Sequence, residues 1–414
     1  MAKARKDHKG RALRKGETYQ KKQKRYVYTY VDPFGKRQYI YAKDLMKLRE
    51  REDTLIKNQL DGLDVYAMGK ADLNFVFDRY ISTKTEIRGS TRYNYMYTYN
   101  QYVRDGFGTR KLGDIKYSDV MYFYLFLMEE KGLGVSTVEN VQTVLHPAFQ
   151  LAVRDGIIRN NPSDGVMAEL KKKTVGRKSG IRHALTVEQQ KAFVDYLMDK
   201  PKECRWKNLF VFLLGTGCRI GEVIGIRWED VDFEKRVISI NHNFTYYPRT
   251  ENSYKCEFAL GLPKTEAGVR EIPMLPTVYD ALMDEKTFQN ETGMRCQAQI
   301  EGMSNFIFFN RFYNIHNPQA VNRAIKRISE DYNREEVVKA KKEKRDPIIL
   351  PHFTCHSLRH TFCSRLCENE TNVKLIQEIM GHKDIQTTLD IYAEITGSKK
   401  QESFEKLASK LDFF

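Results

Sequence analysis

Two interruptions divide this chain into three stretches that differ in residue periodicity. The first interruption, Asp61 to Gly69, combines glycine with acidic residues, and the second, residues 166 to 182, is rich in Lys and Arg. At 414 residues the chain is long enough for two or three domains with separate cores. We therefore expect a multidomain protein, mainly α-helical with small β-sheets.

Positive charge is concentrated near the N-terminus. Residues 1–50 contain sixteen Lys and Arg against five Asp and Glu, so +11 of the net charge of +15 lies there. This predicts a polyanionic partner for the N-terminus; the alternative is a solvated basic tail that aids solubility. Residues 1 to about 16 are poor in large apolar side chains and are expected to be disordered.

The first stretch, residues 1–66, is expected to form a small, basic, three-stranded β-module. β-Forming residues alternate on both sides of a turn at residues 32–35, which predicts a hairpin, and a helix is expected from Asp44 to about Leu60. Such a sheet could lie in a major groove of DNA, although a basic solvent face is the alternative. The candidate DNA-binding residues are Lys24, Arg25, Lys36 and Arg37.

The second stretch, residues 69–165, predicts a small helical bundle. Apolar side chains recur at helical spacing from Leu73 to Tyr80, and residues 90–103 are expected to be helical despite alternating tyrosines. Ser136 to Glu139 has the form of a capping box that would open another helix. The following residues, 166–182, are predicted to be a basic linker in which Lys171, Lys172 and Lys173 contact phosphates; a plain solvated linker is the alternative.

The third stretch, residues 183–414, predicts a mixed α/β domain. Thr186 to Gln189 is a second capping box, and strand patterns follow at residues 236–246, 257–262 and 269–274. Lys264 would then lie at the tip of a hairpin between the last two strands. Residues 334–345 resemble a charged insertion of unassigned role, and the tail from Ser403 to Phe414 has an amphipathic pattern.

Several polar residues of this third stretch suit the transfer of a phosphoryl group to a tyrosine. Guanidinium groups stabilise the negative charge that nonbridging oxygens gain in the transition state, and Arg219 and Arg359 are the candidates. His356 lies one helical turn before Arg359 and could act as a general base, while His382 could hydrogen-bond the phosphate. Lys264 could protonate the leaving oxygen.

Tyr392 is the candidate nucleophile. It follows His382 by ten residues, it is the only tyrosine after Tyr332, and it stands in a segment, Thr387 to Ile395, with the pattern of a short helix. A tyrosine hydroxyl with a pKa near ~10 needs nearby cations and a proton acceptor to become a nucleophile. The preceding residues supply both kinds of group.

The ordered set Arg219, Lys264, His356-x-x-Arg359, His382 and Tyr392 resembles that of the tyrosine recombinases, the phage-integrase-type site-specific recombinases, and most closely the integrases of conjugative transposons. The resemblance implies an arm-binding domain at 1–66, a core-binding domain at 69–165 and a catalytic domain at 183–414. It also implies that Tyr392 forms a 3′-phosphotyrosine and Lys264 protonates the 5′-oxygen. Glu222 would support Arg219, and the reaction would need no metal, cofactor or ATP.

The implied partners are double-stranded DNA at core and arm sites, neighbouring protomers in a tetramer joined by exchange of the C-terminal tail, and an excisionase. The implied compartment is the bacterial cytoplasm, at the nucleoid, and the seven scattered cysteines agree with a reducing compartment. Three alternatives remain: a non-catalytic DNA-binding regulator, a type IB topoisomerase, and a metallohydrolase built on His352, His356 and His360.

Overall fold

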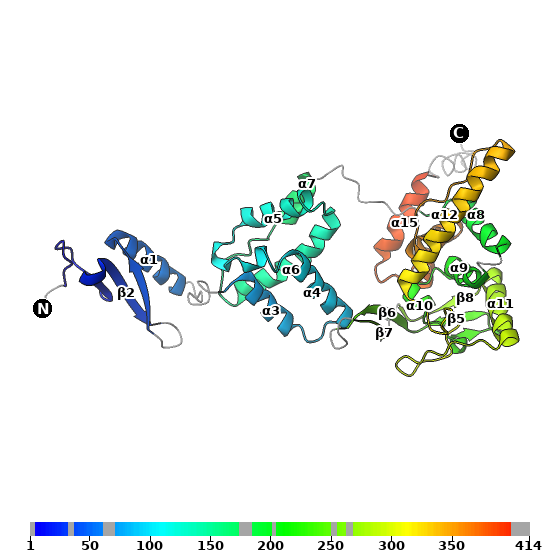
Figure 1. Ribbon diagram of the computed structural model, residues 1–414, viewed down its shortest axis with the longest axis horizontal. Helices are drawn as coiled ribbons and strands as arrows, with labels where there is room; N and C mark the ends of the chain where they lie inside the picture. Colours follow the sequence, from blue (N-terminus) through cyan, green and yellow to red (C-terminus); the bar gives the residue numbers. More distant parts are fainter. Residues whose placement is uncertain are drawn as a thin grey trace, which may run out of the picture. The chain divides into compact units, whose positions relative to one another are not determined.

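The computed structural model describes residues 5–31, 37–60, 71–173, 184–200, 204–249, 255–261 and 268–398. The chain forms two compact units, Met1–Gly180 and Ile181–Phe414 (Figure 1). The first unit contains two separate hydrophobic cores, one under a β-sheet and one within a helical bundle. No helix in the described ranges is both long enough and apolar enough to cross a membrane.

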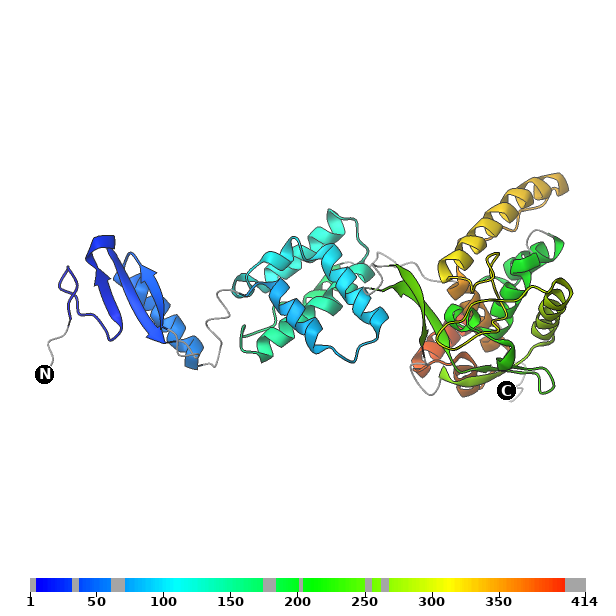
Figure 2. The ribbon, with the colours of Figure 1, turned by 60° about the horizontal axis from the view of Figure 1, so that its bottom comes forward.

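A three-stranded antiparallel sheet begins the first unit. Its strands are β1 (Glu17–Gln20), β2 (Arg25–Val31) and β3 (Arg37–Ala42), in the order β1-β2-β3. Helix α1 (Leu45–Leu60) lies along one face of this sheet (Figure 2). It buries Leu45 and Leu48 against side chains such as Tyr26. The predicted three-stranded module, its hairpin and its helix are therefore confirmed.

The segment before β1 is ordered from residue 5, which corrects the prediction of disorder up to residue 16. The buried carboxylate of Asp7 accepts hydrogen bonds from the Arg11 side chain at 2.8 Å and the Tyr26 hydroxyl at 2.9 Å. Burial alone would raise the pKa of Asp7, but these hydrogen bonds hold it well below its usual value. Composition did not reveal this polar anchor because it joins residues distant in sequence.

Five helices build the bundle that follows. They are α3 (Leu73–Thr83), α4 (Gly89–Tyr102), α5 (Tyr117–Glu129), α6 (Val135–Arg154) and α7 (Val166–Lys173). Two short 3-10 turns, Phe107–Thr109 and Leu112–Asp114, connect α4 to α5. The rings of Phe77 and Tyr99 stack in the core, and the Tyr99 hydroxyl donates to Asn74 at 2.9 Å. The helical prediction for residues 90–103 is thus confirmed.

Two predictions for this region are wrong. Helix α6 begins at Val135, and its N-cap is Gly134, so Ser136 to Glu139 lies inside the first turn and forms no capping box. The basic linker was predicted to start at residue 166, but Val166–Lys173 is helix α7, which buries Val166 and Leu170 in the bundle core. Apolar residues four apart outweigh the charge of the three lysines there.

The second unit surrounds helix α9 with helices and two small sheets. Its elements in order are α8 (Val187–Asp199), α9 (Cys204–Thr216), α10 (Ile220–Val223), a 3-10 turn (Trp228–Asp230), β4 (Val231–Asp232), β5 (Val237–Ile240), β6 (Asn243–Pro248), β7 (Cys256–Gly261), β8 (Arg270–Pro273), α11 (Pro276–Thr292), α12 (Pro318–Glu343), α13 (Cys355–Asn369), α14 (Val373–Met380) and α15 (Ile385–Ser398). The strands pair antiparallel as β4-β5-β8 and β6-β7.

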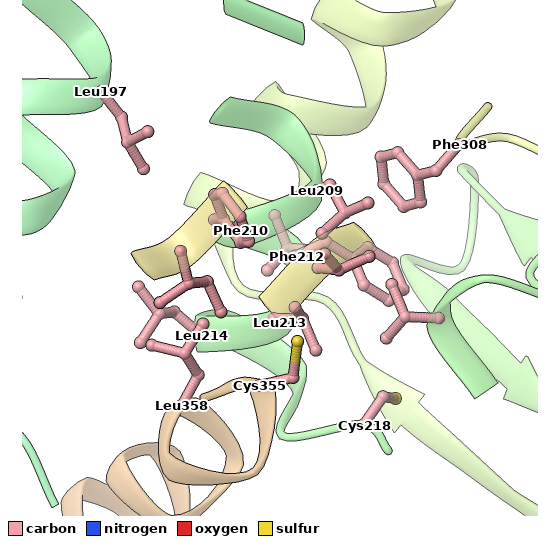
Figure 3. Close-up of a cluster of buried hydrophobic side chains, with 14 of the residues drawn as sticks. Leu197, Leu209, Phe210, Phe212, Leu213, Leu214, Cys218, Phe308, Cys355 and Leu358 are labelled. Carbon is pink, nitrogen blue, oxygen red and sulfur yellow. The ribbon is translucent and has the colours of Figure 1, made fainter. Parts of the chain in front are cut away.

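Helix α9 is apolar on nearly all sides, which explains its central position. Phe210, Phe212 and Leu213 are fully buried, and Leu358 of α13 packs into the same cluster (Figure 3). A helix that is hydrophobic all round is stable in water only when other elements cover it. The core therefore fixes the start of α13, which carries His356 and Arg359, beside the end of α9, which Arg219 follows by three residues.

The structure corrects one further expectation in this unit and places the charged segment 334–345. Strands β7 and β8 do not form a hairpin, because β7 pairs with β6 and β8 pairs with β5. The charged residues 334–345 form mostly the end of α12, where Tyr332, Glu336 and Ala340 are buried at four-residue spacing. The capping box of Thr186 with Gln189 and the helix around Tyr392 are confirmed.

Candidate active site

The end of α9 and the start of α10 position Arg219. Gly217 between them has a φ of +60°, and a side chain there would meet the ring of Phe362 at 2.3 Å, so the turn requires glycine. Arg219 caps α10: its backbone N–H donates to Glu222 Oε2 at 2.8 Å and its Nη1 to Oε1 at 2.9 Å. The predicted contact between Glu222 and Arg219 is thus present. The Arg219 side chain stays 43% exposed.

Arg359 lies on α13 and is 4% exposed. Its Nη1 donates to the carbonyl of Gly217 and its Nη2 to the carbonyl of Met380, both at 2.6 Å. Burial and the neighbouring Arg219 lower its pKa to about 10, so the guanidinium remains charged at neutral pH. Arg359 therefore joins the glycine turn before Arg219 to the end of α14.

The C-terminus of α14 receives three guanidinium groups. The carbonyl oxygens of Ile379, Met380 and Gly381 accept hydrogen bonds from Arg270 Nε at 2.8 Å, Arg359 Nη2 at 2.6 Å and Arg219 Nη2 at 2.8 Å. The last carbonyls of a helix have no partner within the helix and carry partial negative charge, so cations stabilise them. These arginines, with Glu222, are called the arginine cluster below.

His382 follows this helix end and is 8% exposed. Its Nδ1 lies 2.9 Å from the Thr388 hydroxyl, and Gln377 Nε2 donates to its carbonyl at 3.0 Å. Burial, together with the positive charges of Arg359 and Arg219, lowers the pKa of His382 to about 4. The ring is therefore neutral at pH 7, and Thr388 engages one of its two nitrogens.

The remaining histidines of the predicted set lie on α13. His356 is exposed in the first turn of the helix, one turn before Arg359, as the sequence predicts. His360 is half-buried, and its Nδ1 lies 3.4 Å from the Ser364 hydroxyl. His352 precedes the helix, so of the three histidines in the metallohydrolase alternative only His356 and His360 keep their four-residue spacing on α13.

Tyr392 lies on α15 and is half-buried. It packs at the edge of a cluster formed by Cys363, Cys367, Ile376 and Met380. The first two of these residues belong to α13 and the others to α14. The helix that carries Tyr392 thus packs on the helix that carries Arg359 and on the helix that leads to His382.

Some predicted residues lie elsewhere or outside the described ranges. Lys264, Lys36 and the tail 403–414 belong to ranges that the structure does not describe, as does the side chain of Lys173. Arg25 stacks over the Tyr41 ring at 3.9 Å, Arg37 is exposed at the start of β3, and Lys24 has a φ of +46° just before β2. Lys172 is exposed on α7, and Lys171 on the same helix pairs with Glu139.

Sequence reasoning missed Arg270 and Thr388. Arg270 begins β8 two residues before the fully buried Ile272, and alternate residues of a strand face the same side. This alternation could have revealed a buried cation. Thr388 gives no comparable signal, because its partner His382 lies six residues away across the turn between α14 and α15.

Comparison with known proteins identifies the class. The description "Phage integrase family" matches residues 183–398, and "DNA binding domain of tn916 integrase" matches residues 1–59. The chain belongs to the phage integrase family and is a tyrosine site-specific recombinase. The resemblance stated above is therefore confirmed.

Its relatives include integrases of conjugative transposons. The transposase from transposon Tn1545 of Streptococcus pneumoniae is 32% identical over 98% of this chain and 97% of the relative. The corresponding protein from Tn916 of Enterococcus faecalis is 31% identical with the same coverage. A solved structure of the Tn1549 transposon integrase in complex with transposon right end DNA has 28% identity and a TM-score of 0.69, covering 82% of this chain and all of that one.

Proposed function

We propose that this recombinase integrates and excises a conjugative transposon by cutting and rejoining DNA through Tyr392. Two observations support the mobile element: the relatives named after transposons match over nearly the whole chain, and the Tn1549 integrase binds transposon right end DNA. The chemistry rests mainly on one feature, the end of α14, where Arg219 and Arg359 converge next to the neutral His382.

In this proposal two members of the arginine cluster, Arg219 and Arg359, bind the scissile phosphate. Arg219 and Arg359 stabilise the charge that the nonbridging oxygens gain, and the neutral imidazole of His382 hydrogen-bonds one of them. Because Arg219 is partly exposed and Arg359 is enclosed, Arg219 provides the first contact with an incoming phosphate. Glu222 orients Arg219 without touching the DNA.

The reaction itself exchanges one phosphodiester for another. The Tyr392 oxygen attacks phosphorus and loses its proton to His356, while the 5′-oxygen leaves and takes a proton from Lys264. The product is a 3′-phosphotyrosine and a free 5′-hydroxyl. A 5′-hydroxyl of the partner strand then reverses these steps, so the bond energy is conserved.

The other parts of the chain bring DNA and protomers together. Residues 1–66 bind arm sites through Lys24, Arg25, Lys36 and Arg37, residues 69–165 bind the core site, and the stretch after α7 up to residue 182 links them to the catalytic domain at 183–414. The apolar spacing of Phe404, Leu407, Leu411 and Phe414 suits exchange of the tail within a tetramer. An excisionase would act on this assembly to set its direction.

A suicide substrate tests the proposal. When the wild-type protein cleaves a core site with a nick close to the scissile phosphate, the short 5′ fragment diffuses away and the covalent complex accumulates. We expect an adduct that survives denaturant with wild-type protein and none with Tyr392→Phe, while both proteins bind the site equally. Adducts from Tyr392→Phe would refute the nucleophile, and wild-type binding without any adduct would favour a DNA-binding regulator.

A further inference from the structure

Arg270 is a buried cation next to the proposed phosphate site, and all three of its guanidinium nitrogens donate to groups of the protein. Its side chain is 5% exposed, and its guanidinium lies between the start of β8, the end of α14 and α10. Nε donates to the carbonyl of Ile379 at 2.8 Å, and Nη2 donates to Glu222 Oε2 at 2.9 Å. The same Nη2 lies 3.8 Å from the Cys218 sulfur. All of these partners belong to the protein itself.

Glu222 is shared between Arg270 and Arg219. Each carboxylate oxygen accepts from both residues: Oε1 from Arg219 Nη1 at 2.9 Å and Arg270 Nη1 at 3.3 Å, and Oε2 from the Arg219 backbone at 2.8 Å and Arg270 Nη2 at 2.9 Å. Burial would raise the pKa of Glu222, but the charges of Arg270 and Arg219 hold it below its usual value. Two cations thus neutralise one buried carboxylate.

This sharing decides how much positive charge Arg219 can offer to a substrate. With Arg270 in place, Glu222 is already paired, and the exposed part of Arg219 can attract a phosphate. Without Arg270, Glu222 would be a buried anion whose only remaining guanidinium partner among the described residues is Arg219. A buried carboxylate pairs strongly with a single available cation, so Glu222 would compete with the phosphate for Arg219.

We propose that Arg270 is a positioning residue for strand cleavage. It satisfies Glu222 so that Arg219 remains available to the phosphate, and it holds the end of α14 so that His382 keeps its place. The inference rests on the proposed function, in which Arg219 and His382 act on the scissile phosphate. A cation with only a structural role would affect the stability of the fold, but its effect on the cleavage rate would not depend on the charge of Glu222.

The test measures single-turnover cleavage of the suicide substrate by Arg270→Gln, Arg270→Lys, Glu222→Gln and the double variant Arg270→Gln/Glu222→Gln. We expect Arg270→Gln to cleave about 100-fold more slowly than wild type, as misplacement of reacting groups commonly causes, with unchanged affinity for DNA. Arg270→Lys keeps the charge and should recover part of the rate. Glu271→Gln, the exposed neighbour on β8, is the matched control and should cleave at the wild-type rate.

The double variant separates positioning from stability. If Glu222 captures Arg219 when Arg270 is absent, removal of the Glu222 charge should make the double variant cleave faster than Arg270→Gln alone. Additive losses, or a wild-type rate for Arg270→Gln, would overturn the inference. If thermal unfolding shows that Arg270→Gln does not fold, the double variant decides, because it leaves no unpaired carboxylate. A folded double variant that is still about 100-fold slower than Glu222→Gln alone would overturn the inference, since Arg270 would then act independently of Glu222. Failure of the proposed function is distinct, because wild type would then form no adduct.

Discussion

The arginine cluster and the helix of Tyr392 are held in place by different kinds of contact. In the cluster, buried guanidinium groups donate to fixed carbonyls and to Glu222 at distances of 2.6 to 2.9 Å. Tyr392 lies half-buried at the edge of an apolar cluster, and its helix also contacts His382 through the Thr388 hydroxyl at 2.9 Å. Directional hydrogen bonds fix geometry, whereas apolar packing permits small sliding movements. We therefore predict that the residues proposed to bind phosphate are pre-organised more firmly than the helix that carries the proposed nucleophile.

The largest expected effect comes from Arg359→Gln, which removes a positive charge from the arginine cluster. The cleavage rate should fall about 1,000-fold, as for the loss of one donor that stabilises transition-state charge. The free energy of unfolding should also fall by about 2 kcal/mol, because carbonyls of Gly217 and Met380 lose buried partners. Single-turnover cleavage and denaturant titration measure the two losses.

Arg334→Gln is the control for this variant. Arg334 is exposed on α12, and its replacement should change the free energy of unfolding by less than about 0.5 kcal/mol. A cleavage rate of Arg359→Gln within tenfold of the wild-type rate would show that strand cleavage does not depend on this buried charge.

A second prediction concerns pH and compares His382 with His316, which is buried at a distance from the site. Burial lowers the pKa of each to about 4. The unfolded chain, with histidines near 6.5, binds these protons at a higher pH than the folded protein. The stability that the two residues contribute is therefore fully present above about pH 6.5 and is lost as pH falls toward 4.

Two variants separate the histidines in this prediction. His316→Gln should flatten the pH dependence of the free energy of unfolding by up to about 1.4 kcal/mol per pH unit and leave adduct formation unchanged. His382→Gln should flatten the dependence and also slow cleavage. Denaturant titrations between pH 4 and 7 provide the measurement; equal slopes in wild type and both variants would contradict the assignment.

The smallest expected effect tests the apolar cluster on which Tyr392 packs. Ile376→Val removes one buried methylene from the cluster on which Tyr392 packs and should cost about 1 kcal/mol of stability. Because this substitution leaves the contact between Thr388 and His382 in place, we expect cleavage to slow only a few-fold while DNA binding is unchanged. A loss as large as that of Arg359→Gln would show that the helix of Tyr392 is as firmly organised as the arginine cluster.

The sequence indicates the candidate site residues more clearly than the contacts that support them. The order from Arg219 to Tyr392 is visible in the chain, and the spacing of Arg219 and Glu222 predicted a contact that the structure contains. Arg270 was missed, because its partners Glu222 and Ile379 are distant in sequence. The roles assigned to Lys264 and the other site residues remain predictions.

The errors in the fold have a common physical cause. The hairpin expected around Lys264 was wrong because strand patterns do not say which strands pair, and β7 and β8 belong to different sheets. Residues 166–173 were assigned to a linker because their lysines are conspicuous, whereas Val166 and Leu170 decide their packing. Local patterns predicted the elements, but tertiary contacts determined their partners.

The most direct measurement identifies the amino acid that carries the DNA. The covalent complex formed on a suicide substrate would be digested with protease and nuclease, and the peptide that retains a nucleotide would be sequenced by mass spectrometry. The chain contains 24 tyrosines, so the measurement distinguishes Tyr392 from 23 other tyrosines that could carry the nucleotide. We predict that the modified peptide contains Tyr392 with the nucleotide on its phenolic oxygen. A nucleotide on any other residue would contradict the central claim.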